Sequence, residues 1–361
     1  VIAAASALAA ILTGGPPRPA VDNYGRQVNP RGRLTELGYF VTGSALTPDG
    51  RFLWTIGAGR VANDIQITRT ADGKVIQTIA DPSQALQGGL TIAADGRHAY
   101  VSDTHDNVGV RTYTLDPRTG LATPGAKIPL PPPSGTAPPD DFPPRTPGSG
   151  GQSYAAGMAI SPDGRTLVVA ENLDDRAAVI DTGSRSVTQV DLKPVSPTGN
   201  HALPEGAAIV GHRAFIADEG DGTVSSFDIT DPGAGVTTVT PQPASPDPVF
   251  IDPTKTHPFG IVASPDGRRL YVSETNADRV LVLDPSNLNA PAGVIYVRRA
   301  EGVGTGPMGM AISGDGSTLF VADSGENAVR AIALSARSVR SAGRRMHLAA
   351  GGEISLSLIH I

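Results

Sequence analysis

The fold of this chain is decided by a segment that reads Ile261-Val-Ala-Ser-Pro-Asp-Gly-Arg-Arg-Leu-Tyr-Val-Ser273. Proline fixes φ at the first central position of a turn, aspartate bonds back to the local backbone, and glycine takes a positive φ. Apolar and β-branched residues flank that turn, so the segment predicts a β-hairpin. The pattern recurs in five further segments, which are residues 44–55, 90–102, 158–170, 207–217 and 310–322.

The repeat continues beyond the hairpin. An acidic residue ends the second strand, a polar turn follows, and a third strand closes on an aspartate, as in residues 274–284. A fourth strand fits in stretches such as residues 186–190 and 294–298. The turn glycines lie 46 to 68 residues apart, at Gly50, Gly96, Gly164, Gly211, Gly267 and Gly316. Four strands per repeat at this period predict an all-β propeller with four-stranded antiparallel blades.

The repeat also sets the expected domain boundaries. The propeller is predicted to span residues 41–335, and a proline-rich insertion at residues 131–151 accounts for the longest interval. Six hairpins followed by an interrupted end favour seven blades with a truncated last blade. Residues 21–40 are expected to form an N-terminal linker with a possible closing strand, and residues 336–355 to begin the last blade or a linker.

Both ends of the chain carry segments outside the repeat. Residues 1–20 hold an alanine-rich apolar run followed by Gly-Gly-Pro-Pro, which resembles the remnant of a secretory signal peptide. The run is too short to span a bilayer, so we expect no transmembrane span and a secreted, periplasmic or cell-surface protein. Read back into codons, residues 356–361 match a transposon adapter used in sequencing libraries, which predicts that the natural coding sequence is cut near Ser355.

Composition excludes several classes of protein. Hydrophobic residues make up 39% of the chain and charged residues 18%, with 43 glycines and 32 prolines, which is typical of a globular all-β protein. The net charge of −6 and the lack of a basic patch with interleaved aromatic residues argue against a nucleic-acid partner. The sequence has no cysteine, no Gly-x-Ser-x-Gly elbow and no His-Glu-x-x-His motif, so thiol, serine-elbow and zinc-protease chemistry are not expected. We expect a monomer.

Acidic and histidine residues are expected to gather on one face of the ring. In a blade, the Pro-Asp-Gly turns lie on one face, whereas the turns after the second strands and the connections entering each blade lie on the other. We call this second face the ligand face. It is predicted to carry Asp103, His105, Glu171, Asp174, Asp218, Glu219, Glu274, Asn276, Asp323 and Glu326, together with His201, Glu205 and His257.

Three interpretations of the ligand face remain open. Acids that recur once per blade fit repeat architecture, in which each carboxylate accepts hydrogen bonds within its own blade or the next. A divalent cation, Ca²⁺ or Mg²⁺, fits a ring of hard carboxylate oxygens, although the sequence lacks calcium-loop spacing. A catalytic centre of the lactonase type fits Glu205, His257 and Arg279 as acid–base and oxyanion candidates.

The repeat also resembles a known family. Residues 264–273, followed by Glu-x-x-x-Asp-x-Val-x-Val-Leu-Asp, resemble the YVTN repeat of YncE-like β-propellers, and the resemblance covers residues 40–335. Residues 43–55 and the proline-rich insertion further resemble propellers fused ahead of an alkaline-phosphatase-like phosphoesterase domain. Such a fusion implies a metal-dependent phosphoesterase after the end of this chain, and none of its catalytic residues can be assigned here.

The resemblance implies an exported binding or interaction module, the non-catalytic front part of a longer protein, with a small molecule or protein on the ligand face. Two alternatives stay open. One is a lactonase-like hydrolase with its site on that face, and the other is a cation-stabilised cell-surface scaffold. An enzyme should lose turnover when Glu205 and His257 are replaced, whereas an interaction module has no turnover to lose.

Overall fold

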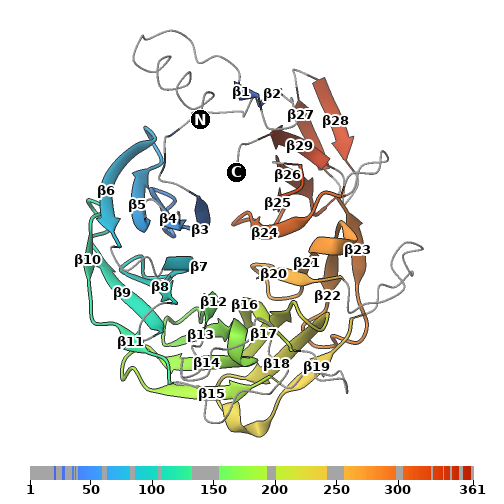
Figure 1. Cartoon of the computed structure of the whole chain (residues 1–361). Helices are drawn as coiled ribbons and strands as arrows, with labels where there is room; N and C mark the ends of the chain where they lie inside the picture. Colours follow the sequence, from blue (N-terminus) through green and yellow to red (C-terminus); the bar gives the residue numbers. More distant parts are fainter. Residues whose placement is uncertain are drawn as a thin grey trace.

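The chain folds as an all-β propeller, in which six sheets stand around a common centre (Figure 1). In this computed structural model the described residues are 20–21, 27–28, 35, 37, 40–58, 63–81, 86–104, 108–131, 154–192, 201–241, 256–297, 304–326, 328–335, 337–341, 344–348 and 353–358. Most of the predicted signal-peptide remnant, most of the proline-rich insertion and His105 lie outside these residues.

Each blade is an antiparallel sheet whose first strand lies nearest the centre (Figure 1). Blades 1 to 3 consist of β3 (Val41–Leu46), β4 (Phe52–Ala58), β5 (Asn63–Arg69) and β6 (Lys74–Ala80); β7 (Leu86–Ile92), β8 (His98–Asp103), β9 (Gly109–Leu115), β10 (Ala122–Pro124) and β11 (Ile128–Pro129); and β12 (Ala155–Ile160), β13 (Thr166–Glu171), β14 (Arg176–Asp181) and β15 (Val187–Asp191). In blade 2, both β10 and β11 pair with β9 and share the outer position.

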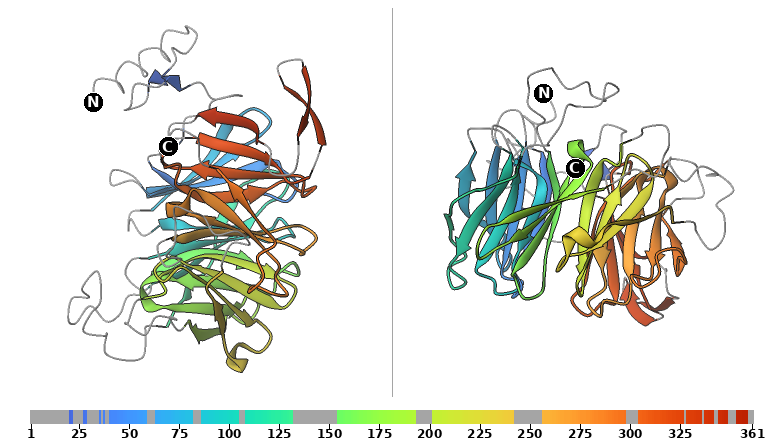
Figure 2. Two further views of the ribbon diagram at one scale, coloured as in Figure 1. Left: turned by 90° about the vertical axis from the view of Figure 1, so that its right-hand side faces the viewer. Right: turned by 90° about the horizontal axis from the view of Figure 1, so that it is seen from below.

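Blades 4 to 6 follow the same order. They consist of β16 (Pro204–Val210), β17 (Arg213–Asp218), β18 (Thr223–Asp228) and β19 (Thr237–Val239); β20 (Pro258–Ala263), β21 (Leu270–Glu274), β22 (Arg279–Leu283) and β23 (Gly293–Tyr296); and β24 (Pro307–Ile312), β25 (Thr318–Asp323), β26 (Ala328–Ala333) and β29 (Glu353–Leu358). A separate pair, β1 (Ala20–Val21) and β2 (Gln27–Val28), and a hairpin, β27 (Arg337–Ser341) and β28 (Arg344–Leu348), lie outside the blades (Figure 2).

The six predicted hairpins are confirmed, and the turn chemistry is as the sequence indicates. In blade 5, Gly267 has φ 66° and its N–H bonds to the Ser264 carbonyl at 2.9 Å. Hydrogen bonds from Ser264 Oγ at 2.6 Å and from the Arg268 N–H at 3.1 Å hold the pKa of Asp266 below its usual range. The turn is thus fixed locally, before any blade packs on another.

Apolar clusters fill the boundaries between consecutive blades from blade 1 to blade 6. The cluster between blades 1 and 2 includes Trp54, which is fully buried and meets Tyr113 edge to face at 5.7 Å between ring centroids. Burying one large apolar side chain stabilises the fold by about 1.5–3 kcal/mol. The core is therefore distributed around the ring rather than gathered in one place.

The described residues form six blades, one on each predicted hairpin, and the sixth sheet has four strands because β29 pairs with β26. Residues 336–355, which were expected to begin the last blade or a linker, contain the separate hairpin of β27 and β28 and the start of β29. Residues 356–358 of the predicted adapter segment lie within β29. No helix in the part of the chain that the structure describes is long and apolar enough to cross a membrane.

Candidate functional site

The acids that end the second strands are engaged inside their own blades. In blade 2, Asp103 Oδ2 accepts from Arg111 Nε at 2.7 Å and lies 3.0 Å from Lys127 Nζ. In blade 3, Glu171 lies 3.6 Å from Arg176 Nε. Three of these charged side chains are buried, namely Asp103, Glu171 and Arg176. Each of the three lies beside a group of opposite charge.

Blades 5 and 6 repeat this arrangement. Glu274 and Arg279 form a buried ion pair, so the arginine expected to stabilise an oxyanion is instead a structural partner. In blade 6, Arg330 binds both Asp323 and Glu326. Burial raises the pKa of Asp323 to about 7, and the charge and hydrogen bond of Arg330 oppose that rise.

Blade 4 departs from this rule, because no arginine among the described residues pairs with its acid. Asp218 is fully buried, and its Oδ2 accepts from Thr223 Oγ1 at 3.0 Å and Ser225 Oγ at 2.6 Å. Burial raises the pKa of Asp218 well above its usual range, and the charge of Asp221 adds to the rise. Its neutral form is therefore favoured in the fold.

The residue after each of these acids shows a second departure. Asn172 and Thr275 each donate to a backbone carbonyl at the start of the next blade, at 3.3 and 2.9 Å. The corresponding residue in blade 4 is Glu219, which as a carboxylate has no proton to donate. Its Oε1 lies 3.5 Å from Nδ1 of His257, the residue before the first strand of blade 5.

The third departure lies in a β-bulge. The register of the first and second strands shifts near the start of every blade, and in blade 4 the shift lies between Pro204 and Gly206, so Glu205 is the bulged residue. Bulges re-aim side chains and are common beside active sites. The matching described residues of other blades do not ionise; they are Thr42, Gly88, Ala156, Phe259 and Met308.

The second and third departures, Glu219 and Glu205, lie close enough for their charges to interact. Asn172 Nδ2 donates to Glu205 Oε1 at 2.9 Å across the boundary between blades 3 and 4. Burial raises the pKa of Glu205 to about 8, and the charge of Glu219 adds to the rise. Burial, with the charge of Glu205, also raises the pKa of Tyr154 to about 12. We call Tyr154, Asn172, Glu205, Glu219 and His257 the rim cluster.

The backbone conformation of His257 belongs to the repeat. Its φ is 53°, in the left-handed region, and the residues directly before the first strands of blades 1, 4 and 6 share it, with φ 52° at Phe40, 46° at Leu203 and 56° at Gly306. The side chain, and not the backbone, therefore distinguishes this position in blade 5. The His257 carbonyl accepts from the Thr275 N–H at 3.0 Å, which fixes the backbone and leaves the imidazole half-exposed beside Glu219.

The rim cluster combines groups that can give and take a proton. The raised pKa of Glu205, about 8, favours its protonated form at neutral pH. The Glu219 carboxylate and the His257 imidazole supply acceptors within the same cluster. A proton donor and an acceptor pair on one rim are the requirement for general acid–base chemistry.

The structure separates the sequence-predicted residues into two groups. It brings Glu205, Glu219 and His257 together, and it binds Arg279 into the blade 5 ion pair. Asn276 lies in a short 3-10 turn, and its N–H bonds to the Thr256 carbonyl at 3.1 Å. Within the described ranges, no group of three or more His, Asp or Glu side chains is placed to hold a metal ion such as Ca²⁺ or Mg²⁺.

Sequence reasoning missed Asn172 and Tyr154. Asn172 follows the acid of its blade directly, so an alignment of the repeats at that acid would have drawn attention to it and to Glu219. Tyr154 has no such signal, because its backbone carbonyl is fixed by the Asn172 N–H at 2.9 Å only in the folded blade.

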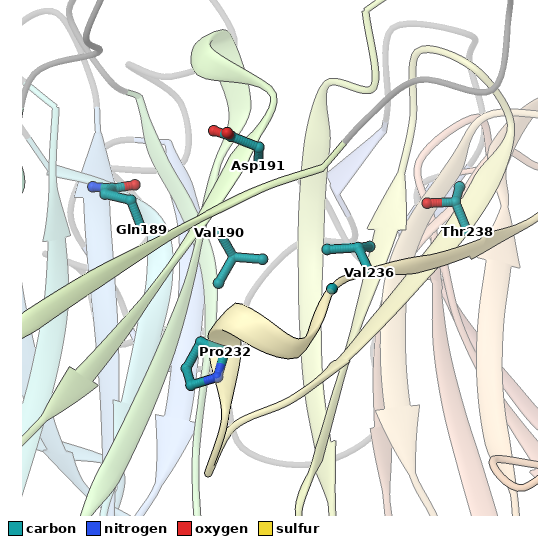
Figure 3. A pocket seen from close by; sticks show the side chains of 7 residues that line it. Gln189, Val190, Asp191, Pro232, Val236 and Thr238 are labelled. Atoms are coloured by element: carbon teal, nitrogen blue, oxygen red, sulfur yellow. The ribbon is translucent and has the colours of Figure 1, made fainter.

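A shallow hollow lies apart from the rim cluster, at the outer strands of blades 3 and 4 (Figure 3). It has a volume of about 250 Å³ and is lined by Gln189, Val190, Asp191, Pro232, Gly235, Val236 and Thr238. None of these residues belongs to the rim cluster, and their positions at the outer edge separate the hollow from the acid–base groups.

Comparisons with known proteins agree with the fold. The family model described as "Lactonase, 7-bladed beta-propeller" matches residues 201–343, which contain Glu205, Glu219 and His257. No curated protein matches the chain.

Solved structures of propellers are also similar. Virginiamycin B lyase from Staphylococcus aureus is 15% identical, with a TM-score of 0.56 over 86% of this chain and 84% of that one. Hydrazine synthase from Kuenenia stuttgartiensis is 16% identical, with a TM-score of 0.58 over 84% and 79%. At this identity the likeness shows the propeller fold alone.

Proposed function

We propose that the chain binds a small molecule at the rim cluster and acts on it by general acid–base catalysis. One observation carries this proposal. Glu205 and Glu219 place two carboxyl groups at positions that other described blades fill with residues that do not ionise, and the pKa of Glu205 is raised to about 8. Perturbed carboxyl groups in a shared site are a mark of functional residues.

Hydrolysis of a cyclic ester fits these groups. The imidazole of His257, oriented by Glu219, takes a proton from water as its oxygen bonds to the ester carbonyl carbon. The bond from that carbon to the ring oxygen then breaks, and protonated Glu205 donates its proton to the leaving alcohol oxygen. The proton held by His257 returns to Glu205 or to solvent. The family-model match over residues 201–343 supports a lactone as the substrate class.

A binding module without turnover is the second candidate. The observation that favours it is the position of Arg279, which is bound to Glu274 in the blade core and does not join the rim cluster. Among the described rim-cluster residues, Tyr154 is then the neutral donor that remains to stabilise an oxyanion, because the Asn172 amide already donates to the Pro204 carbonyl and to Glu205.

Acid release from simple γ- and δ-lactones in a pH-stat separates the two candidates. If the chain is an enzyme, turnover should fall as pH rises through about 8, because Glu205 must be protonated to donate. Glu205→Gln should abolish that turnover, while Asp266→Asn, in a turn on the opposite face, should keep it. Lactone-induced thermal stabilisation without acid release would favour the binding module, and neither effect in any lactone would contradict the proposal.

A further inference from the structure

The charges of the chain are divided unevenly between the two faces of the ring. We call the face that carries the Pro-Asp-Gly turns the turn face. In blades 1, 2, 3 and 5 its turns read Asp-Gly-Arg, at residues 49–51, 95–97, 163–165 and 266–268, so each of these turns combines a negative charge with a positive one. Opposite charges therefore largely cancel on the turn face.

The ligand face has a different balance, because its basic side chains are already bound. Arg111, for example, binds Asp81 at 2.9 Å and Asp103 at 2.7 Å. The arginine and lysine side chains described at this face each have a nitrogen within 3.6 Å of a carboxylate oxygen; they are Arg111, Lys127, Arg176, Arg279 and Arg330. These groups are thus already neutralised and do not offer a positive charge to a ligand.

Further acids on this face are held by backbone N–H groups and an imidazole rather than by arginine or lysine. Asp278 accepts from the Thr305 N–H at 2.6 Å. Asp175 accepts from the Leu203 N–H at 3.1 Å, and its other oxygen lies 2.5 Å from Nδ1 of His201. The described part of the ligand face therefore keeps an excess of negative charge. The segments outside the described residues between residues 59 and 303 hold equal numbers of acidic and basic residues, so they do not reverse this excess.

The rim cluster lies in the same negative field. The charge of Glu219 raises the pKa of Glu205, and the charge of Glu205 raises the pKa of Tyr154. A neighbouring arginine opposes such a rise in pKa, as Arg330 does at Asp323. No described arginine or lysine has this effect on the pKa of Glu205 or Tyr154.

We propose that the ligand of the rim cluster is a cation, a small lactone that carries an ammonium group near its ester. This inference rests on the function proposed above and specifies its substrate class. The Glu219 carboxylate, whose side chain is 30% exposed, is the charge that such an ammonium group would meet at the site. A lactone with a carboxylate or phosphate group would meet the same negative field without an arginine or lysine to bind it.

Equilibrium binding of two lactones of the same shape tests the proposal. α-Aminomethyl-γ-butyrolactone carries an ammonium group at pH 7, and α-ethyl-γ-butyrolactone has a methyl group in its place. Dissociation constants are measured by calorimetry in Glu205→Gln, which keeps residue 205 neutral and should not hydrolyse either lactone. At low salt the aminomethyl lactone should bind at least about threefold more tightly. This preference should vanish at about 1 M salt, where the Debye length is about 3 Å.

Two charge variants in the same background locate the source of the preference. Glu219→Gln should reduce it by about two- to fivefold. Asp231→Asn removes one negative charge from an exposed position on the turn face and should leave the preference unchanged. An equal loss in both variants would overturn the proposal, because the preference would then come from the net charge of the protein and not from the rim cluster.

The outcomes also separate this inference from the proposed function. Equal binding of the two lactones, together with hydrolysis of the ethyl lactone by the wild type, would overturn the inference and leave the function intact. Tighter binding of the aminomethyl lactone without hydrolysis by the wild type would support the inference and contradict acid–base catalysis. Binding of neither lactone would overturn both.

Discussion

Blades 4 and 5 are built on the same repeat, yet their rims differ at three matched positions. Blade 5 closes each position within the fold, by an ion pair, a hydrogen bond to the next blade and an apolar side chain. Blade 4 has glutamates at the last two positions, and at the first its aspartate accepts hydrogen bonds from hydroxyl groups instead of pairing with an arginine. The differing pairs are Asp218 and Glu274, Glu219 and Thr275, and Glu205 and Phe259.

This difference indicates which positions of a repeat are available for function. A residue that recurs in every blade is explained by its role in blade structure. A residue that breaks the repeat and leaves polar groups without their usual partners has no such structural explanation. Blade 4 gives up an ion pair and a hydrogen bond between blades, and it gains the raised pKa of Glu205. Natural proteins accept such losses of stability mainly at functional sites.

The largest expected effect comes from breaking the blade 5 side of the comparison. Arg279→Ala removes the partner of Glu274 and leaves a buried charge, which should destabilise the protein by about 3–5 kcal/mol. In blade 4, Ser225→Ala removes one hydrogen bond to Asp218 and should cost about 1–3 kcal/mol. Urea unfolding measures the loss of stability in both variants. Equal losses would contradict the distinction between an acid paired with an arginine and one bound by hydroxyl groups.

The next effect is a pH dependence of stability at Glu205. Its folded pKa of about 8 lies above its ordinary value of 4.5, so folding favours the protonated form. The contribution of this carboxyl group to the free energy of unfolding is therefore fully present below pH 4.5 and is lost as pH rises toward 8. The Glu205→Gln side chain cannot ionise. The stability of this variant relative to the wild type should therefore rise from pH 5 to 8 and stay constant above pH 8.

Asp266→Asn provides the control of opposite sign. Hydrogen bonds hold the pKa of Asp266 below its ordinary value, so the carboxylate contributes stability above that value and loses it as pH falls through the lowered pKa. Asp266→Asn should therefore be less stable than the wild type at neutral pH. Unfolding midpoints across pH would contradict the account if both variants shifted in the same direction.

A smaller effect is expected at His257, where blade 4 has Leu203 with a similar positive φ. His257→Gly should change stability by no more than about 1 kcal/mol, because the relief of positive φ offsets the added freedom of the unfolded chain. It should also abolish ligand-induced stabilisation. His257→Ala, which keeps the strain, is the matched control, and unchanged binding in both would remove His257 from the site.

An effect of similar size, in the stabilising direction, is expected from restoring the repeat. Glu219→Thr gives blade 4 the residue of blade 5, whose hydroxyl donates across the boundary at 2.9 Å. The new hydrogen bond should stabilise the protein by about 0.5–1.5 kcal/mol, while acid–base activity is lost. A variant that is destabilised instead would show that Glu219 already serves the blade structure.

Most of the fold could be predicted from the sequence because the decisive information is local. Turns such as the one at Asp266 and Gly267 form from neighbouring residues, so each hairpin can be recognised in isolation. The number of blades rests on a less local argument than the hairpins do. It depends on the angle between blades, which is set by contacts such as that of Gly260 with a carbonyl of the next blade.

The candidate site could be predicted only in part. The ligand-face acids follow from the repeat, and Glu205 and His257 were named because they lie in connections on that face. That Arg279 binds Glu274 was missed, although both are in one hairpin, because the sequence does not show which face a charged side chain takes. The contact between Asn172 and Glu205 depends on two blades meeting, which no local pattern encodes.

The most direct test of the central claim is a titration of Glu205 itself. Side-chain carboxyl groups labelled with ¹³C at glutamate can be followed by NMR from pH 4 to pH 10, in the wild type and in Glu205→Gln. We expect one carboxyl signal that titrates near pH 8 and is missing from the variant. If every glutamate carboxyl titrated below pH 6, Glu205 would be ionised at neutral pH, and the proposed acid–base site would be wrong.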